Sequence, residues 1–172
     1  MQKRTAAITT TVFAFAAPGM VAGVLPWQVR GEASPHLPSG PLSRMLGSGL
    51  VLGGSAIVTD CFVRFVRARG TPAPVAETED LVATGLYRYT RNPQYVGVLS
   101  VIAGQAVLWR SPRILAYGAV VATCFNLTVH LYEEPRLHRR FGDDYVRFTE
   151  QIPRWPLPRR LLRKPGRWYP SP

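Results

Sequence analysis

Four long apolar stretches limit what this chain can fold into more strictly than any other feature of its sequence. A helix needs about 20 residues, with a range of about 17 to 25, to cross the hydrocarbon core of a bilayer. The first, second and fourth stretches meet this length, and the third meets it if its helix begins at Pro93. The four ranges are 6–29, 42–66, 93–109 and 114–132. The sequence therefore predicts an all-α integral membrane protein in which the 172 residues form one membrane domain with four transmembrane helices.

The first stretch can also be interpreted as a signal peptide. Lys3 and Arg4 precede an apolar run that ends in small residues at 14–17, and secretory signals have this order. The apolar character resumes after Pro18 and continues to Trp27, which is long for a cleaved segment. This length favours a spanning helix.

Basic side chains indicate the orientation of the four predicted helices. With four spans, both termini lie on one side of the membrane, and seventeen of the 21 Lys and Arg residues fall on that side. The remaining four are Arg30, Arg44, Arg110 and Arg113. Because Lys-rich and Arg-rich loops stay in the cytoplasm, we expect both termini and the site described below to be cytoplasmic. The net charge of +11 and the basic tail, residues 159–172, then suit membrane lipids better than nucleic acid.

Small residues predict which helices pack closely. The second stretch has many of them between Gly47 and Ala56, and such residues let helix backbones approach each other in lipid. We therefore expect the second helix to be central. In the third stretch Gly97 and Gly104 share one face, which admits either another helix or a flat ligand. The short connection 109–112 makes the third and fourth helices antiparallel neighbours.

Asp60 and Arg64 lie one helical turn apart near the predicted cytoplasmic end of the second stretch. An ionisable residue at such a depth is a candidate functional group. Arg64, four residues further on, is also a suitable partner for the Asp60 carboxylate. We favour the ion pair over a direct functional role.

Two polar segments next to the third and fourth stretches form the candidate site. The first, residues 85–97, combines arginines, tyrosines and an asparagine with Pro93, which suits the first position of a helix. The second, residues 133–158, begins with the paired acids Glu133 and Glu134. If the two predicted helices form a hairpin, both segments lie at the same membrane face.

A stripe of polar side chains leads into the second segment. Asn126, His130 and Glu134 recur every four residues, so they share one face of the fourth helix. Such a stripe faces either a ligand or neighbouring helices, and the sequence leaves both open.

The chain after the stripe is expected to change direction at Pro135. Residues 136–148 then place apolar side chains at helical spacing opposite charged ones, which predicts an amphipathic helix lying on the membrane interface. Residues 152–158 contain three prolines, which end that helix.

The side chains of the two segments suit a zwitterionic ligand with an aromatic base. Carboxylates can receive an ammonium group and hydroxyls, arginine can hold a carboxylate in a bidentate fork, and tyrosines can face a sulfonium or stack on a base. S-adenosylmethionine carries all of these groups, but the arginines also suit a nucleotide phosphate. The sequence contains no Gly-rich strand-to-helix turn, no Ser-His-Asp order and no His/Cys cluster with metal-ligand spacing.

Four motifs between residues 81 and 158 resemble the isoprenylcysteine carboxyl methyltransferases and the related phospholipid N-methyltransferases. They are Gly85-Leu-Tyr-Arg-Tyr-Thr-Arg-Asn-Pro-Gln-Tyr-Val-Gly97, Tyr132-Glu-Glu-Pro135, Phe141-Gly-Asp-Asp-Tyr145 and Ile152-Pro-Arg-Trp155. The resemblance implies an integral-membrane enzyme that binds S-adenosylmethionine between its last two helices and the C-terminal segment. It also implies methyl transfer to a lipophilic acceptor from the bilayer, such as a prenylcysteine carboxylate or a phospholipid.

The resemblance assigns expected roles to individual residues. The expected cofactor residues are Arg91, Asn92, Pro93, Tyr95 and Gly97 of the Arg-His-Pro-x-Tyr-x-Gly motif, Glu133 and Glu134 of the acidic pair, and Tyr87 as a further aromatic face. Asn92 stands where the family often has His, and an amide does not titrate near neutral pH. An amine or phenol acceptor must lose a proton, for which His130 and Glu134 are the candidate catalytic groups, whereas a carboxylate acceptor needs no base.

Two other functions fit parts of the same sequence. A membrane reductase of the sterol-reductase type has a similar arginine-proline-tyrosine pattern and would bind NADPH, although paired carboxylates disfavour a phosphate ligand. A non-catalytic membrane scaffold with a lipid-binding basic tail is the third possibility.

Overall fold

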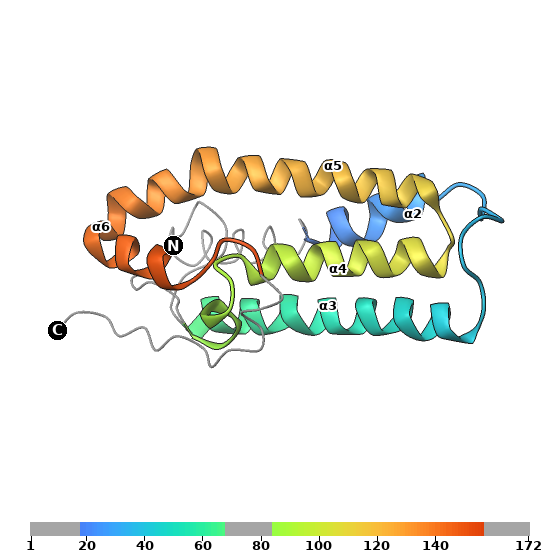
Figure 1. The fold of residues 1–172 in the computed structure, drawn as a ribbon, viewed down its shortest axis with the longest axis horizontal. Helices are drawn as coiled ribbons and strands as arrows, with labels where there is room; N and C mark the ends of the chain where they lie inside the picture. The colour runs from blue at the N-terminus through green and yellow to red at the C-terminus, as the bar shows by residue number, and fades with distance from the viewer. Residues whose placement is uncertain (1–17, 68–83, 157–172) are drawn as a thin grey trace, which may run out of the picture.

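The computed structural model describes residues 18–67 and 84–156, and the regular structure within them is entirely helical (Figure 1). The elements are η1 (Met20–Val24), α2 (Leu25–Val29), α3 (Pro41–Arg67), η2 (Gly85–Arg88), α4 (Pro93–Leu108), α5 (Pro112–Thr128), η3 (Val129–Glu133) and α6 (Glu134–Gln151). η1 and η3 are π-helical turns, and η2 is a 3-10 turn. The prediction of an all-α fold is confirmed for this part of the chain.

Two of the helices are long and apolar enough to cross a membrane. They are Pro41–Arg64 of α3 and the segment Pro112–Gln151, which contains α5, η3 and α6. Met20–Val29 and α4 are apolar but shorter, so helix length supports two of the four predicted spans among the described residues. Large apolar side chains lie exposed on the long helices, with Leu52 of α3 at 71% and Val120 of α5 at 62%. An apolar exterior of this kind suits a lipid environment.

The helix boundaries follow the predicted stretches closely, because a proline marks the start of three helices. Pro41, Pro93 and Pro112 lie at the first helical position of α3, α4 and α5, where the missing N–H of proline is not needed. α3 and α4 agree with their predicted ranges to within one residue at each end. Of the first predicted helix, only the part from Met20 to Val29 belongs to a described element. Residues 1–17, on which the signal-peptide interpretation depends, and the basic tail lie outside the described residues.

Glycines bring α3 and α4 into close contact. Gly54 faces Gly97, and Gly47 faces Gly104, so that two pairs seven residues apart meet across the antiparallel helices. A Cβ at Gly54 would lie 2.5 Å from the carbonyl oxygen of Gly97, and a Cβ at Gly104 would lie 2.6 Å from that of Gly47. The close packing predicted for the second helix is thus seen in the structure, and the face with Gly97 and Gly104 is occupied by a helix. The prediction that the second helix is central is wrong, because α3 packs mainly on α4, and α4 lies between α3 and α5 with η1 against it (Figure 1).

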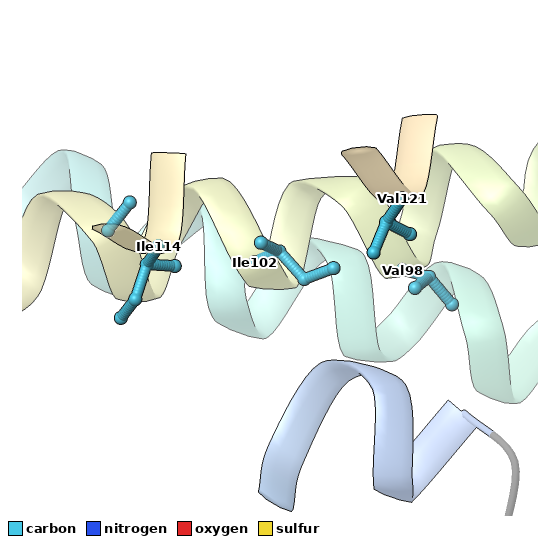
Figure 2. Close-up of a cluster of buried hydrophobic side chains, with 5 residues drawn as sticks. Val98, Ile102, Ile114 and Val121 are labelled. Atoms are coloured by element: carbon cyan, nitrogen blue, oxygen red, sulfur yellow. The ribbon is translucent and has the colours of Figure 1, made fainter. Parts of the chain in front are cut away.

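α4 and α5 form the predicted antiparallel hairpin. Val98, Ile102 and Ala106 of α4 pack against Ile114 and Val121 of α5 in one buried cluster (Figure 2). Residues of η1 and α2 cover this cluster from the side, and they are held there by two polar side chains, Gln105 of α4 and Tyr117 of α5, which donate to backbone oxygens of η1. The hairpin brings the start of α4 and the end of α5 to the same end of the bundle (Figure 1).

The chain continues as a helix through Pro135, which corrects the predicted change of direction at that residue. The π-helical turn η3 directly precedes α6, and a π turn already departs from the regular i to i−4 bonding that a proline would interrupt. The reversal occurs instead at Gly142, whose φ of 51° and ψ of −127° suit glycine alone.

The amphipathic segment is helical as predicted, but it consists of two arms. Because of the break at Gly142, the arms fold toward each other and their apolar side chains form one small cluster. Its members are Leu137, Phe141, Tyr145, Phe148 and Ile152. The cluster directs the chain after Gln151 back toward the start of α4 (Figure 1).

Candidate functional site

The turn that leads into the site is anchored on α3. The guanidinium of Arg64 donates to both carboxylate oxygens of Asp60, at 2.7 and 3.0 Å, which confirms the predicted ion pair. A third nitrogen of Arg64 donates to the hydroxyl of Thr84 at 3.2 Å. Gly85 has a φ of 60°, and a Cβ there would lie 2.1 Å from Arg64 Cζ. Arg64 therefore fits beneath this turn only because residue 85 is a glycine.

Tyr87 attaches the same turn to α3 through a second contact. Its ring is buried, and its side chain is hydrogen-bonded to that of Cys61 in α3. Burial raises the pKa of the Tyr87 phenol well above its ordinary value, so the group is neutral at physiological pH. The structure thus places Tyr87 against α3.

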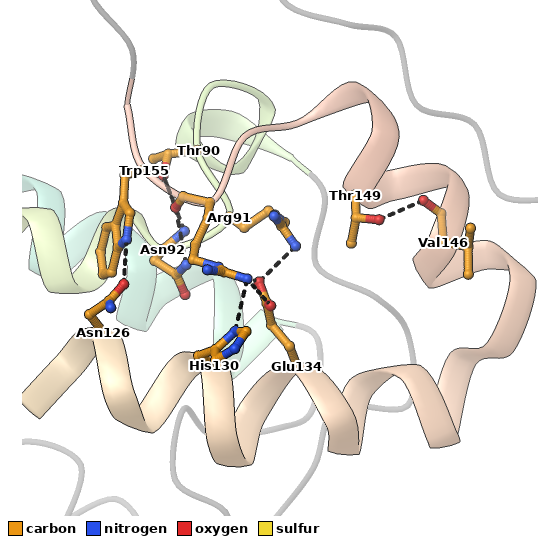
Figure 3. A network of polar contacts seen from close by, with 10 residues as sticks. Thr90, Arg91, Asn92, Asn126, His130, Glu134, Val146, Thr149 and Trp155 are labelled. Atoms are coloured by element: carbon orange, nitrogen blue, oxygen red, sulfur yellow. Dashed lines mark hydrogen bonds and ion pairs between the residues drawn. The ribbon is translucent and has the colours of Figure 1, made fainter.

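Glu134 lies at the centre of a cluster of charged side chains (Figure 3). Its Oε1 accepts hydrogen bonds from Arg91 Nη1 and Arg154 Nε, both at 2.8 Å, and its Oε2 accepts from Arg154 Nη2. The side chains of Arg91 and Glu134 are only 14% and 17% exposed. Arg154 forms a bidentate fork, the arrangement in which charge-assisted hydrogen bonds are strongest. The carboxylate also raises the pKa of Arg154, chiefly through these hydrogen bonds, so the Arg154 guanidinium stays charged.

Residues 152–156, here called the C-terminal strap, lie along the loop that precedes α4. The backbone N–H of Arg91 donates to the carbonyl of Pro153 at 2.9 Å. The carbonyl of Arg154 accepts from Thr90 Oγ1 at 2.8 Å and from Asn92 Nδ2 at 3.1 Å. The side chains of Thr90 and Asn92 therefore both fasten the strap, and an amide can do this without titrating.

The strap also covers the predicted polar stripe of α5. Asn126, His130 and Glu134 point to the same side of the helix (Figure 3). Trp155 Nε1 donates to Asn126 Oδ1 at 3.0 Å, and Arg154 Nη2 lies 3.3 Å from His130 Nδ1. Because a guanidinium can only donate, Nδ1 is the accepting nitrogen, and the imidazole proton is assigned to Nε2.

Glu133, the other member of the acidic pair, turns toward α4. Its carboxylate accepts a hydrogen bond from the hydroxyl of Tyr95. The Tyr95 ring stacks on Phe125 of α5, with ring centroids 4.3 Å apart and an interplanar angle of 28°. Tyr95 therefore connects the acidic pair to both helices of the hairpin.

The predicted residues do not all lie in this cluster. Arg91, Asn92, Tyr95, His130, Glu133 and Glu134 lie together at one end of the bundle. Pro93 is buried as the first residue of α4, and Gly97 faces Gly54 of α3. Sequence reasoning did not single out three residues that complete the cluster, Thr90, Arg154 and Trp155. The Ile-Pro-Arg-Trp motif carried the signal for the last two.

The cluster offers more hydrogen-bond donors than acceptors. Two guanidiniums share the carboxylate of Glu134, and the buried Nε of Arg91 has no hydrogen-bond partner among the described residues. Unpaired buried donors are uncommon in folded proteins, so the Nε of Arg91 is a candidate position for an acceptor atom of a ligand. Within residues 18–67 and 84–156 no group of three His, Cys, Asp or Glu side chains could hold a metal ion. The arrangement therefore suits an organic ligand with an anionic group.

Comparisons with known proteins agree with the motifs that meet at this cluster. The family model of the phospholipid methyltransferases matches residues 42–144. Protein-S-isoprenylcysteine O-methyltransferase B of Arabidopsis thaliana is 31% identical over 111 residues, which are 63% of this chain and 54% of the relative. Protein-S-isoprenylcysteine O-methyltransferase A of the same plant is 34% identical over 76 residues, which are 44% of this chain and 39% of the relative.

The chain spans about half the length of the first of these relatives and less of the second. No solved structure matches it. The family model, in contrast, covers α3, α4, α5 and most of α6, which is more than half of the chain and includes Arg91 and the acidic pair. The chain therefore belongs to the phospholipid methyltransferase family.

Proposed function

We propose that this protein is an integral-membrane methyltransferase that uses S-adenosylmethionine to methylate a lipophilic acceptor. The observation that carries the proposal is the convergence of Arg91, His130, Glu134 and Arg154, which come from three separate segments, at one end of the helix bundle. Family membership supports methyl transfer over the reductase and scaffold alternatives.

The donors and acceptors of the cluster match the polar groups of the cofactor. The unpartnered Nε of Arg91 would hold its carboxylate, since a guanidinium recognises carboxylates in a planar fork. Glu133 would receive the ammonium group or a hydroxyl, and Tyr95 orients that carboxylate through its hydrogen bond. When bound, the cofactor supplies an electrophilic methyl group on a sulfonium. Asn92 and Pro93 contribute by positioning, because one fastens the strap and the other begins α4.

The protein's contribution to catalysis in this proposal is mainly positioning. Methyl transfer is an in-line displacement, and holding the two reactants in the correct geometry lowers its barrier substantially. Glu134 fixes Arg91 and Arg154, and both of its oxygens are occupied by guanidinium donors. His130 Nδ1 faces the Arg154 guanidinium as well, so either candidate would remove a proton from an amine or phenol acceptor only once Arg154 has moved away from it.

The proposed membrane arrangement has four spans, with both termini and the cluster on the cytoplasmic side. Arg91 and Glu134 form a direct ion pair, which supports an arrangement that keeps the two segments on one side of the bilayer. The bias of Lys and Arg toward that side supports the cytoplasmic assignment. The names of the relatives make a prenylcysteine carboxylate one candidate acceptor, and the family description makes a phospholipid another.

Cofactor binding by variants of the cluster tests the proposal. Arg91→Ala and Glu133→Gln should each abolish binding of S-adenosylmethionine to the purified protein in detergent, measured by calorimetry. Glu150→Gln is a matched control, because it removes a carboxylate from an exposed position of α6 and should leave the affinity unchanged. Thermal stability of each variant separates loss of the site from loss of the fold.

Two results would contradict the proposal. The wild-type protein could bind NADPH and fail to bind S-adenosylmethionine, which would favour the reductase. Alternatively, Arg91→Ala and Glu133→Gln could both bind S-adenosylmethionine with the affinity of the wild type and of the control, and the cluster would then not be the cofactor site. Membranes incubated with a methyl-labelled cofactor and separated into lipid and protein fractions would identify the class of acceptor.

A further inference from the structure

The end of the bundle opposite the candidate site carries three arginines close together. Arg30 follows α2, while Arg110 and Arg113 belong to the α4–α5 turn and the start of α5, and Figure 1 shows these segments at the end away from α6. None of the three forms an ion pair with an acid in the described part of the chain, although Glu32 lies in the same loop. We call these three residues the arginine cluster.

Two indole rings hold the guanidinium of Arg30. Its Cζ lies 5.3 Å from the ring centroid of Trp27 and 5.7 Å from that of Trp109. Cation–π contacts use the flat face of the guanidinium, so the N–H groups at its edge remain available to an acceptor. Trp27 is 57% exposed, and indoles concentrate at the boundary between lipid and water.

Arg110 has an unfavourable backbone conformation for its residue type. Its φ of 52° lies in the left-handed region, where glycine or asparagine usually follows a helix. The conformation is held by the N–H of Ser34, which donates to the Arg110 carbonyl at 2.8 Å, and by Arg110 Nε, which donates to the carbonyl of Leu37 at 3.2 Å. Arg110 directly follows the C-cap residue of α4, and these loop contacts hold it in the conformation that ends the helix.

The three arginines are tied to one another through the same loop. Ser111 donates from its hydroxyl to the carbonyl of Arg30, and its oxygen also caps α5 by accepting from Ile114 N. The side chain of Arg113 lies directly over Gly31, where a Cβ would approach Arg113 Nη1 to 2.9 Å. These contacts place the three arginines in one region at this end of the bundle.

We propose that the arginine cluster binds the phosphate of an anionic phospholipid. Guanidiniums match the geometry of phosphate oxygens, and three unpaired cations would lower their mutual repulsion by sharing an anion. Exposed apolar side chains of the adjoining helices, Met20, Val24 and Leu115, provide a surface along which acyl chains can lie. The proposal does not depend on methyltransferase activity.

The test uses the full chain in detergent and the fluorescence of its tryptophans. Short-chain phosphatidylglycerol, short-chain phosphatidylcholine and inorganic phosphate are titrated separately. Phosphatidylglycerol should bind saturably and at least about fivefold more tightly than phosphatidylcholine, and inorganic phosphate should not displace it. Arg113→Gln should weaken this binding about fivefold. Arg110→Gly should weaken it similarly while keeping the fold, because glycine suits a φ of 52°.

Arg44→Gln is the matched control. It removes the same charge from the exposed first turns of α3, outside the cluster, and should leave the affinity for phosphatidylglycerol unchanged. Equal binding of the two lipids would overturn the proposal, and so would an equal loss in Arg44→Gln and Arg113→Gln, because general electrostatic attraction would then explain the data. Displacement by inorganic phosphate would overturn the assignment to a lipid.

Discussion

Substitution of Gly54 by alanine tests the contact between α3 and α4 directly. The new Cβ would lie 2.5 Å from the carbonyl oxygen of Gly97 and 2.9 Å from Val101. Ordinary contacts of a Cβ begin near 3.4 Å, so the two helices must separate locally by about 0.9 Å. The carbonyl oxygen of Gly97 and the backbone nitrogen of Val101 cannot rotate away from the new methyl group, because both are backbone atoms of α4.

The expected cost combines two opposing effects. Overpacking a close contact costs about 1–3 kcal/mol. Alanine also favours a helix over glycine by about 1 kcal/mol, which offsets part of this cost. Gly53, the preceding residue of α3, has no atom within 4 Å of its Cβ position, so Gly53→Ala gains the helical preference alone. The difference between the two variants therefore isolates the steric cost of about 1–3 kcal/mol.

Thermal unfolding of both variants in the same detergent measures this difference. For a chain of this size, 1 kcal/mol corresponds to about 2–4 °C, so Gly54→Ala should unfold about 2–12 °C below Gly53→Ala. Equal midpoints for the two variants would refute the α3–α4 contact described here. A midpoint for Gly53→Ala below that of the wild type would indicate that another helix occupies the face we find open.

Three further predictions concern the site and its supports. Arg91→Gln and Glu134→Gln should show a coupling of about 1–3 kcal/mol in a double-mutant cycle of unfolding free energies, because their ion pair is largely buried; additive effects would contradict the pairing. Gly142→Ala should destabilise the protein by about 1–2 kcal/mol, since alanine is strained at a φ of 51°, and a neutral result would mean that α6 is unbroken. Gly85→Ala should weaken cofactor binding by displacing Arg64, and Arg64→Ala in the same chain should restore part of the affinity by making room for the new methyl group; no restoration would place the clash elsewhere.

The helices could be predicted because their limits are set by local chemistry. Apolar runs of sufficient length, each preceded by a proline, identify α3 and α4 without reference to any neighbour. The glycines were recognisable as packing residues, but the pairing of Gly47 with Gly104 depends on how two helices align in space. The break at Gly142 was not foreseen, because the apolar periodicity of residues 136–148 continues across it.

Site residues that recur at helical spacing could be predicted from the sequence. Site residues that contact backbone groups of a distant segment could not. The stripe that leads to Glu134 follows from the four-residue spacing alone. Thr90, by contrast, meets the strap through the carbonyl of Arg154, 64 positions further along the chain, and no pattern of residue types predicts such a bond. Arg154 itself reaches Glu134 only because α6 folds back on itself.

The helix that runs from Pro112 through α5 and η3 to Glu133 determines how deep in the membrane the acidic pair would lie. A helix that enters the hydrocarbon at Pro112 advances 1.5 Å with each residue, so Glu133 is about 30 Å further on, which is the thickness of the hydrocarbon core. In the proposed membrane arrangement the two carboxylates would therefore lie at the level where lipid gives way to water. A molecule dissolved in the aqueous phase and a molecule anchored by its hydrocarbon tail can both reach that level without leaving their own solvent.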